Sequence, residues 1–360
     1  MTTTYAPPPR EPWLERMRRS LISSPTTAVL NLLALIAIVM IAVPIVRWGL
    51  IDAVWVGADG ADCPTGTGAC WAFIRDKMPL ILFGRYPFAE HWRPFVATGL
   101  LVATVAVTLN PLFWSRRLAV AWVAVVPVYL VLMRGGVLGL SQVDSSEWGG
   151  LPLTILLTVF GVAFGLVLAI PVALARFSKL PVFRWSATLY VEAVRGVPLI
   201  SVLFMASVLL PLVLPDGLTP NGIGRVLVGI VLFFAAYMAE VLRGGLQSIP
   251  RGQFEACNAL GLGYWRTMRK VVLPQAFEVV LPALVNLIIG ALKGTSLVVI
   301  VAMMDLLGAA QASLADPKWI GFYVEAYVFA GLVYALMCGA ISWYGRRIER
   351  SLRRTRTHGD

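Results

Sequence analysis

The chain has 360 residues, of which 58% are hydrophobic and only 14% are charged. Soluble domains carry about 25% charged residues, so this composition excludes an ordinary soluble protein and indicates a membrane protein. The formal net charge is +11, but the Arg residues cluster beside apolar runs, which favours a role in membrane orientation over nucleic-acid binding.

Residues 1–27 are Pro-rich and charged, and they predict a flexible cytoplasmic tail. The apolar run that follows continues for about nineteen residues, which is long for a signal-peptide core and suits a retained span. Similar runs, long enough to cross about 30 Å of hydrocarbon, predict an all-α polytopic membrane protein with about eight transmembrane helices. They lie at 28–46, 94–113, 118–133, 151–175, 196–215, 226–239, 279–304 and 326–345.

The distribution of Lys and Arg predicts the orientation of the chain. With the N-terminus inside and the spans alternating, 20 of the 30 basic residues fall on inner segments and 8 on outer segments. Cytoplasmic loops carry an excess of Lys and Arg, so both termini are expected in the cytoplasm.

This orientation places the loop 47–93 outside. The loop is rich in Gly, Asp and aromatic residues and shows no strong helical period. Cys63 and Cys70 form a disulfide if the outer compartment is an oxidising periplasm, and two free thiols are the alternative. Cys257 and Cys338 are interpreted as packing residues, and the four Cys residues do not have the spacing of metal ligands.

The chain divides into two parts at the tract VDSSEWGG (143–150), which is interpreted as an extended connection. Residues 28–145 hold three spans and the outer loop, and the sequence identifies no chemistry there. Residues 146–345 hold five spans and most of the polar features, and a basic cytoplasmic tail is expected at 346–360.

A polar insert at 244–277 lies between two apolar runs on the cytoplasmic side. Apolar residues recur at helical spacing in its first half, and Gly261 and Gly263 then break the helix. A second amphipathic piece follows and is expected to end at Pro274. Such an element either presents its first helix to a cytoplasmic partner or only anchors the loop at the membrane surface.

Lys293 interrupts the apolar run 279–304. At 1.5 Å per residue it lies about 22 Å beyond Glu278, and a charge at that depth is costly unless it is paired or hydrated. Lys293 is therefore expected to face a wet translocation pathway, with a structural interhelical bond as the alternative. Gly294 and the two hydroxyls after it suit a locally opened helix. The candidates for contact with a substrate carboxylate or amine are Asn286, Lys293, Thr295 and Ser296.

The pattern Glu-x-x-Arg-Gly occurs twice near the inner surface, at Glu192 and Arg195 and again at Glu240 and Arg243. The i,i+3 spacing lets each pair meet on its own helix. The pairs act either as interfacial anchors or as part of a cytoplasmic-side gate in which they exchange partners. Pro198, which closely follows the first pair, predicts a kink.

No GxxxxGK[ST] string occurs in the chain, so ATP binding through a P-loop is not expected, and energy must come from another chain or an ion gradient. The main alternative, an ion-coupled secondary transporter of small polar solutes, needs carboxylates near mid-membrane, and no acidic residue lies deep in a predicted span. A membrane enzyme is disfavoured because both His residues lie outside the spans. No catalytic residue, cofactor or metal is predicted.

Five separated segments, in order, resemble those of ABC importer permeases of the polar amino acid (histidine/glutamine-type) family. They are TILLTVFGVAFGLVLAIPVALARFS (154–178), YVEAVRGVPL (190–199), AAYMAEVLRGGLQSIPRGQFEA (235–256), LPALVNLIIGALKGTSL (281–297) and RRIERSLRR (346–354). Within the insert, EACNALGLGYWRTMRKVVLPQA resembles the cytoplasmic EAA loop of these permeases. The three extra spans and the outer loop further resemble the longer membrane subunit of the general L-amino acid importers.

The resemblance implies a type I ABC importer transmembrane domain with a three-helix N-terminal extension, located in the bacterial inner membrane. Such a permease translocates L-amino acids from periplasm to cytoplasm by alternating access. The implied partners are a homologous permease subunit in a heterodimer, two cytoplasmic ATPase subunits, a periplasmic amino-acid-binding protein and membrane lipid.

The resemblance also assigns a coupling helix that docks on the ATPase, with the residues Glu255, Ala256, Cys257, Ala259, Leu260 and Gly261. Three positions depart from the family pattern. Cys257 replaces the second Ala of EAA, Val197 stands where Thr is usual, and Gly294 stands where Asp is common. The changes at Val197 and Gly294 weaken the inferences about the substrate more than those about coupling to the ATPase.

Overall fold

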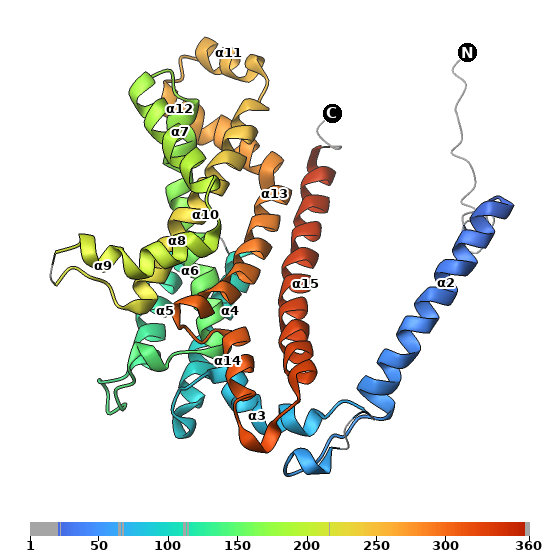
Figure 1. Cartoon of the computed structure of the whole chain (residues 1–360). Coiled ribbons are helices and arrows are strands. Elements are labelled where there is room, and N and C mark those ends of the chain that lie inside the picture. Colours follow the sequence, from blue (N-terminus) through green and yellow to red (C-terminus); the bar gives the residue numbers. More distant parts are fainter. Residues whose placement is uncertain are drawn as a thin grey trace. The chain divides into compact units, whose positions relative to one another are not determined.

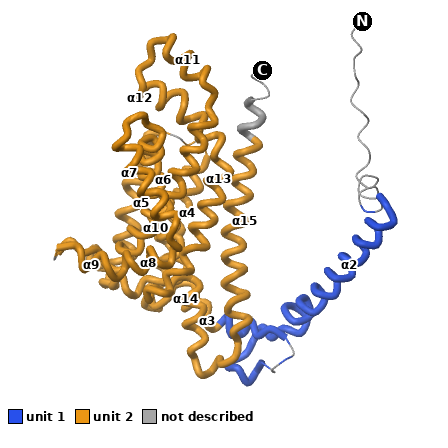
Figure 2. Tube along the Cα trace, turned by 45° about the horizontal axis from the view of Figure 1, so that its top comes forward, with its two compact units in different colours: residues 1–75 blue, residues 76–360 orange. Residues whose placement is uncertain are grey.

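The computed structural model of the protein is all-α where it describes the chain, with short 3₁₀ and π segments and two isolated β-bridges. The described residues are 21, 23–63, 66, 68–110, 113, 115–215 and 217–356, with side chains up to residue 350. Most of the expected N-terminal tail and the last four residues of the expected basic tail lie outside them. The chain forms two compact units, residues 1–75 and 76–360, which are described separately (Figures 1 and 2).

The described part of unit 1 contains an apolar helix and a disulfide-bonded loop. Helix α2 (Pro25–Val46) begins after Ser24, whose side chain accepts a hydrogen bond from the amide of Thr27 (3.2 Å). It continues as a π turn at Arg47–Ile51, and none of these residues is buried. An apolar surface on every side of such a long helix suits contact with lipid.

The outer loop contains a helix that is not expected from the sequence. Helix α3 (Trp71–Phe83) begins directly after Cys70 and includes Pro79. The sequence of the loop, which shows no strong helical period, does not predict this helix. The charged residues Arg75, Asp76 and Lys77 interrupt the apolar pattern by which a helix is recognised.

Unit 2 is a helical bundle in which α6 and α10 lie at the centre (Figure 1). Its helices are α4 (Trp92–Thr108), α5 (Arg116–Arg134), α6 (Gly150–Phe177), α7 (Pro181–Arg195), α8 (Leu199–Val208), α9 (Leu210–Val213), α10 (Gly222–Gln247), α11 (Arg251–Ala259), α12 (Tyr264–Thr267), α13 (Leu273–Gly294), α14 (Leu306–Ser313) and α15 (Tyr323–Arg356). Helix α15 runs beside α13 and continues without a break into the expected basic tail.

Among the described residues, six helical segments are long and apolar enough to cross a membrane, and there are seven if the bent pair α7 and α8 counts as one span. The two helices of that pair meet at 104°, at the position where Pro198 predicts a kink. The expectation of about eight spans is higher because it counts the run 94–113. That run folds as α4, whose 17 residues are about 26 Å long, at the lower limit for a membrane span.

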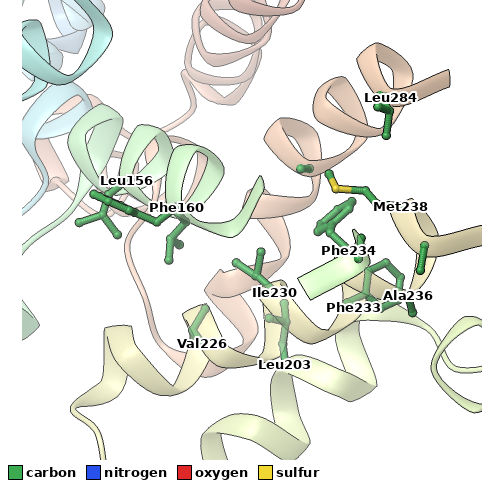
Figure 3. Close-up of a cluster of buried hydrophobic side chains, with 14 of the residues drawn as sticks. Leu156, Phe160, Leu203, Val226, Ile230, Phe233, Phe234, Ala236, Met238 and Leu284 are labelled. Carbon is green, nitrogen blue, oxygen red and sulfur yellow. The ribbon is translucent and has the colours of Figure 1, made fainter. Parts of the chain in front are cut away.

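The core of unit 2 forms where α10 packs against its neighbours. Figure 3 shows Leu156 and Phe160 of α6 beside Ile230 of α10, and all three side chains are buried. On its other side α10 approaches α13 so closely that a Cβ atom at Gly245 would lie 2.5 Å from Val280 Cγ1. Helix α10 therefore fixes the positions of α6 and α13 relative to each other.

Helices α4 and α5 share this core. Ala97 and Leu101 of α4 and Tyr129 of α5 belong to the same buried cluster as α6. The hydroxyl of Tyr129 also donates a hydrogen bond to the carbonyl of Pro152 at 3.3 Å. The expected boundary near residue 145 therefore separates two parts of the sequence that pack together, and the compact units divide instead after Arg75.

Candidate functional site

Helix α11 is the first helix of the polar insert, and the residues after it fix its end. The amide of Leu262 donates to the carbonyl of Cys257 and the amide of Gly261 to that of Asn258, both at 3.0 Å. This pair of bonds is a Schellman motif. Gly261 has a φ of +68°, which glycine adopts without steric cost. The helix therefore ends at the glycine that the sequence marks as a breaker.

One face of α11 packs on its own chain and the other is exposed. Cys257 is 4% exposed, and the ring of Phe254 stacks on that of Phe177 with centroids 6.3 Å apart. Leu260 is 77% exposed. The expected docking residues that are also exposed are Glu255, Ala256, Ala259 and Gly261. Cys257, which the resemblance also assigns to docking, is turned toward the interior of the chain.

The second half of the insert joins α13 without a break. Helix α12 passes into a π turn, Met268–Val272, and then into α13. The expectation that Pro274 ends a separate helix is wrong, because Pro274 lies in the first turn of α13. Proline has no amide hydrogen to donate to the carbonyl of Lys270, and the π turn directly before it accommodates this gap.

Five charged side chains from three helices form an ion cluster. On α10, Arg243 Nη2 and Nε lie 2.6 and 3.0 Å from the carboxylate oxygens of Glu240. On α7, Arg195 Nη1 lies 4.0 Å from Glu192 Oε1 and 3.9 Å from Glu240 Oε2. Both i,i+3 pairs are therefore present, and Arg195 connects them.

Arg176 completes the ion cluster, and sequence reasoning does not assign it to this site. From the last turn of α6, its Nη2 lies 2.8 Å from Glu192 Oε1 and its Nη1 contacts Glu240 Oε2. Its side chain is only 8% exposed. In the sequence, Arg176 is one of many basic residues at the end of an apolar run, a position typical of interfacial anchors, so no signal separates it from the others.

The four expected pathway residues differ in their surroundings. Asn286 and Lys293 are exposed on α13, and their spacing of seven residues puts them on one face of the helix. Lys293 forms no ion pair with the described residues. Ser296 is half-buried, and Thr295 is buried. Asn286 and Lys293 therefore lie on the surface of the single chain, whereas Thr295 does not.

After Gly294 the backbone tightens into a 3₁₀ helix, Thr295–Val301. The hydroxyl of Thr295 donates to the carbonyl of Leu292 (2.7 Å) and that of Ser296 to the carbonyl of Lys293 (2.8 Å). The expectation of a locally opened helix is wrong, because these hydroxyls bond carbonyls three residues earlier in the chain.

Asp305, a buried carboxylate for which the sequence pattern predicts no role, holds the end of this segment. It is fully buried, caps α14 by accepting a hydrogen bond from the amide of Gly308 (2.9 Å), and accepts a second one from the hydroxyl of Tyr334 (2.8 Å). The hydroxyl of Thr295 lies 3.4 Å from that of Tyr334. Thr295 thus belongs to a buried polar network between α13, α14 and α15.

A second group of charged residues, separate from the ion cluster of Arg176, joins α3 to the segment before α15. Lys77 pairs with both Asp76 and Asp316, and the indole of Trp319 donates to Asp76 at 2.8 Å. The hydrogen bond from Lys77 lowers the pKa of Asp316. The same lysine lowers the pKa of Asp76.

The disulfide between Cys63 and Cys70, whose Cα atoms are 5.9 Å apart, lies in unit 1.

Residues 161–354 match the family of binding-protein-dependent transport system inner membrane components. This range includes α11, the ion cluster of Arg176 and the exposed residues of α13. The family match therefore coincides with the part of the chain in which sequence and structure locate the candidate site.

Two curated proteins are similar over nearly the full length of the chain. The inner membrane amino-acid ABC transporter permease protein YhdY of Escherichia coli is 40% identical over 347 residues, which are 95% of this chain and 93% of the relative. The glutamate/glutamine/aspartate/asparagine transport system permease protein BztC of Rhodobacter capsulatus is 33% identical over 405 residues, with coverages of 94% and 93%. The similarity thus extends to the helices before the family match.

Among solved structures, the chain is similar to one described as the crystal structure of an amino acid ABC transporter with histidines. The TM-score is 0.50 and the sequence identity 29%, and the alignment covers 56% of this chain and 92% of the other.

Proposed function

Since the chain belongs to the family of binding-protein-dependent transport system inner membrane components and is the inner membrane permease of an amino acid ABC importer, we propose that α11 transmits the energy of ATP hydrolysis to its helices. The chain transports and does not catalyse, and an ATPase and a binding protein are its partners. In the proposed assembly it pairs with a homologous permease subunit as a heterodimer. Two ATPase subunits lie below the pair, and a periplasmic amino-acid-binding protein delivers the substrate.

The exposed face of α11 supports docking to the ATPase. Leu260 projects beside two small residues, Ala256 and Ala259, so a shallow groove on a partner can approach the helix closely. Only a few residues separate α11 from α10 on one side and from α12 on the other, and α12 continues into α13. A displacement of α11 by closure of the ATPase pair is therefore delivered directly to α10 and α13, two helices of the core.

Lys293 is proposed to contact the carboxylate of the amino acid during translocation. Its ammonium is exposed in the single chain, and Asn286 lies two helical turns before it on the same face. A hydrated ammonium without an ion-pair partner can remain at this depth only beside water, a solute or a second chain. The ion pairs of Glu192, Arg195, Glu240 and Arg243 form part of the cytoplasmic-side gate in this proposal.

The proposed orientation has both termini in the cytoplasm and the disulfide-bonded loop in the periplasm, as the excess of Lys and Arg favours. Figure 1 shows α11 at one end of unit 2 and α14 at the other. The cluster of Lys77, Asp76 and Asp316 then lies on the periplasmic side. Residues 28–145 form the proposed three-helix extension of a type I permease core, as in the longer subunit of a general L-amino acid importer.

The observation that carries this proposal is an exposed helix between two core helices in a chain that has no P-loop string. The test is uptake of labelled L-amino acids into proteoliposomes that contain the chain, a second permease, the ATPase and the binding protein. We expect uptake to require both ATP and the binding protein and to persist when an ionophore collapses the proton gradient.

The same experiment examines the alternative, an ion-coupled secondary transporter. Uptake by this chain alone, driven by a proton or sodium gradient without ATP, would contradict the proposal. Loss of uptake on removal of the ATPase, with the gradient intact, supports the proposed ATP-driven import.

A further inference from the structure

Two side-chain contacts link α11 to different core helices. Phe254 stacks on Phe177 at the end of α6, with the ring planes 26° apart. Gln253 accepts a hydrogen bond from the side chain of Gln275 on α13 at 3.2 Å. The glutamine pair is exposed, whereas both aromatic rings pack against the buried core. The aromatic contact is thus the firmer of the two.

The two residues that end α6 connect α11 to the ion cluster. Phe177 holds the ring of Phe254, and the preceding residue, Arg176, pairs with Glu192 on α7 and Glu240 on α10. Arg176 is nearly fully buried, and its Nε has no hydrogen-bond partner among the described residues. A small shift of the end of α6 therefore moves a guanidinium whose position is set by two carboxylates on two other helices.

The two carboxylates hold Arg176 unequally. Glu240 is 23% exposed and contacts all three arginines, whereas the side chain of Glu192 is 58% exposed. Exposed ion pairs contribute little to stability, so the contact between Arg176 and Glu192 is the one that breaks first. Its loss would remove the ion pair between α6 and α7, and α7 is the helix that meets α8 at the 104° bend.

We propose that Phe177 and Arg176 are positioning residues that carry the displacement of α11 from Phe254 to the ion cluster and thereby release or hold α7. This inference rests on the proposed function, because it requires α11 to be moved by an ATPase. It adds a route through α6 to the direct connections of α11 with α10 and α13.

The test measures amino acid uptake and phosphate release by the complete importer in proteoliposomes, and it compares the uptake per ATP hydrolysed. The variants are Phe177→Ala, Arg176→Gln and the double variant. Phe183→Ala is the matched control, because this phenylalanine on the neighbouring α7 is 60% exposed. Phe177→Tyr keeps the ring and serves as the conservative variant. The amount of ATPase that copurifies reports assembly of each complex.

We expect each single variant to lower uptake per ATP at least fivefold while ATP hydrolysis stays within twofold of wild type. Uptake per ATP in the double variant should be no lower than in the more affected single variant, since both changes interrupt one route. Phe183→Ala and Phe177→Tyr should keep the wild-type ratio. If the Phe177→Ala complex does not assemble, Phe177→Leu is compared with Phe177→Tyr, and a lower ratio for leucine is the expected result.

Unchanged uptake per ATP in both single variants overturns the proposed route, and so does a double variant whose loss is the product of the single losses. The wild-type complex separates this result from a failure of the proposed function. Absence of ATP-dependent uptake in the wild type contradicts the function itself, whereas normal wild-type uptake with unaffected variants contradicts only the role of Phe177 and Arg176.

Discussion

Lys293 gives the most direct test of the translocation pathway at the scale of a single residue. Its side chain is exposed and forms no ion pair with the described residues, so replacing it by Gln should change the free energy of unfolding by no more than about 0.5 kcal/mol. If the ammonium contacts the substrate carboxylate, uptake should fall at least tenfold in Lys293→Gln. Proteoliposome uptake, together with thermal unfolding of the purified chain, measures both effects.

Lys293→Arg is the control for charge, and it should retain much more uptake than Lys293→Gln. Full uptake by Lys293→Gln would show that the lysine has another role, such as contact with a second permease chain.

The cluster of Lys77, Asp76 and Asp316 predicts a pH dependence of stability. Its hydrogen bonds lower the pKa of both carboxyl groups, so their contribution is complete above the ordinary carboxyl pKa of about 4. This contribution is lost as the pH falls through the lowered pKa values, since the unfolded chain binds protons first. Between pH 6 and pH 3, the melting temperature of the wild type should therefore fall more than that of Lys77→Met. Parallel pH profiles for the two proteins would show that the cluster does not stabilise the fold.

For single residues, the sequence predicts the role of charges that form a recognisable pattern, such as an i,i+3 pair, and not of charges at the ends of apolar runs. The i,i+3 spacing predicts that Glu240 meets Arg243, and the two side chains form a bidentate pair. Arg176 and Asp305 are missed because each lies at the end of an apolar run, where charged residues are common. Only the approach of α7 and α10 to α6 shows that Arg176 is buried.

At the scale of elements, the contact between α10 and α13 depends on one glycine. A Cβ atom at Gly245 would lie 2.5 Å from Val280 Cγ1 and 2.9 Å from the carbonyl oxygen of Ala276. Gly245→Ala should therefore destabilise the chain by about 1–3 kcal/mol through overpacking. The melting temperature of the purified permease measures the change.

Gly244 is the matched control, because nothing lies within 4 Å of a Cβ atom built at this exposed position. Gly244→Ala should be neutral or stabilise α10 by up to about 1 kcal/mol, owing to the higher helix propensity of alanine. Equal melting temperatures for the two variants would mean that α10 and α13 are not in the close contact described.

Periodicity predicts long helices well and their ends less well. The apolar runs at 151–175 and 226–239 lie within α6 and α10, although α10 extends well beyond the predicted run. Pro274 is expected to end a helix, yet the helix continues through a π turn because the insert packs onto the start of α13. Such departures depend on packing between segments distant in sequence, which local pattern does not record.

At the scale of the whole molecule, the orientation can be tested with the native cysteines. Cys63 and Cys70 are bonded to each other, and Cys257 is buried on α11. In right-side-out vesicles of Cys338→Ser, a membrane-impermeant maleimide should label the chain only after reduction with an impermeant phosphine. The Cys338→Ser chain with the further changes Cys63→Ser and Cys70→Ser should lose this labelling. Labelling from the cytoplasmic side alone would reverse the proposed topology.

The sequence predicts the class of the molecule because composition and five ordered motifs do not depend on tertiary contacts. It does not predict that α4 and α5 pack into the core with α6, since Tyr129 and Pro152 meet only in the folded chain. The three-span extension expected from the sequence therefore contains two kinds of helix. Helix α2 belongs to unit 1, whereas α4 and α5 are part of unit 2.

Site-directed crosslinking tests whether α11 is the point where ATP hydrolysis acts on this chain. A cysteine at Ala259, on the exposed face of α11, is placed in a chain with Cys257→Ala and Cys338→Ser, and the importer is treated with a short crosslinker that joins a thiol to a nearby lysine amine. We expect a crosslink to the ATPase chain that stops ATP-dependent uptake, and none from a cysteine at Val167, an exposed residue of α6. An Ala259→Cys chain that imports normally and crosslinks to no ATPase would contradict this role of α11.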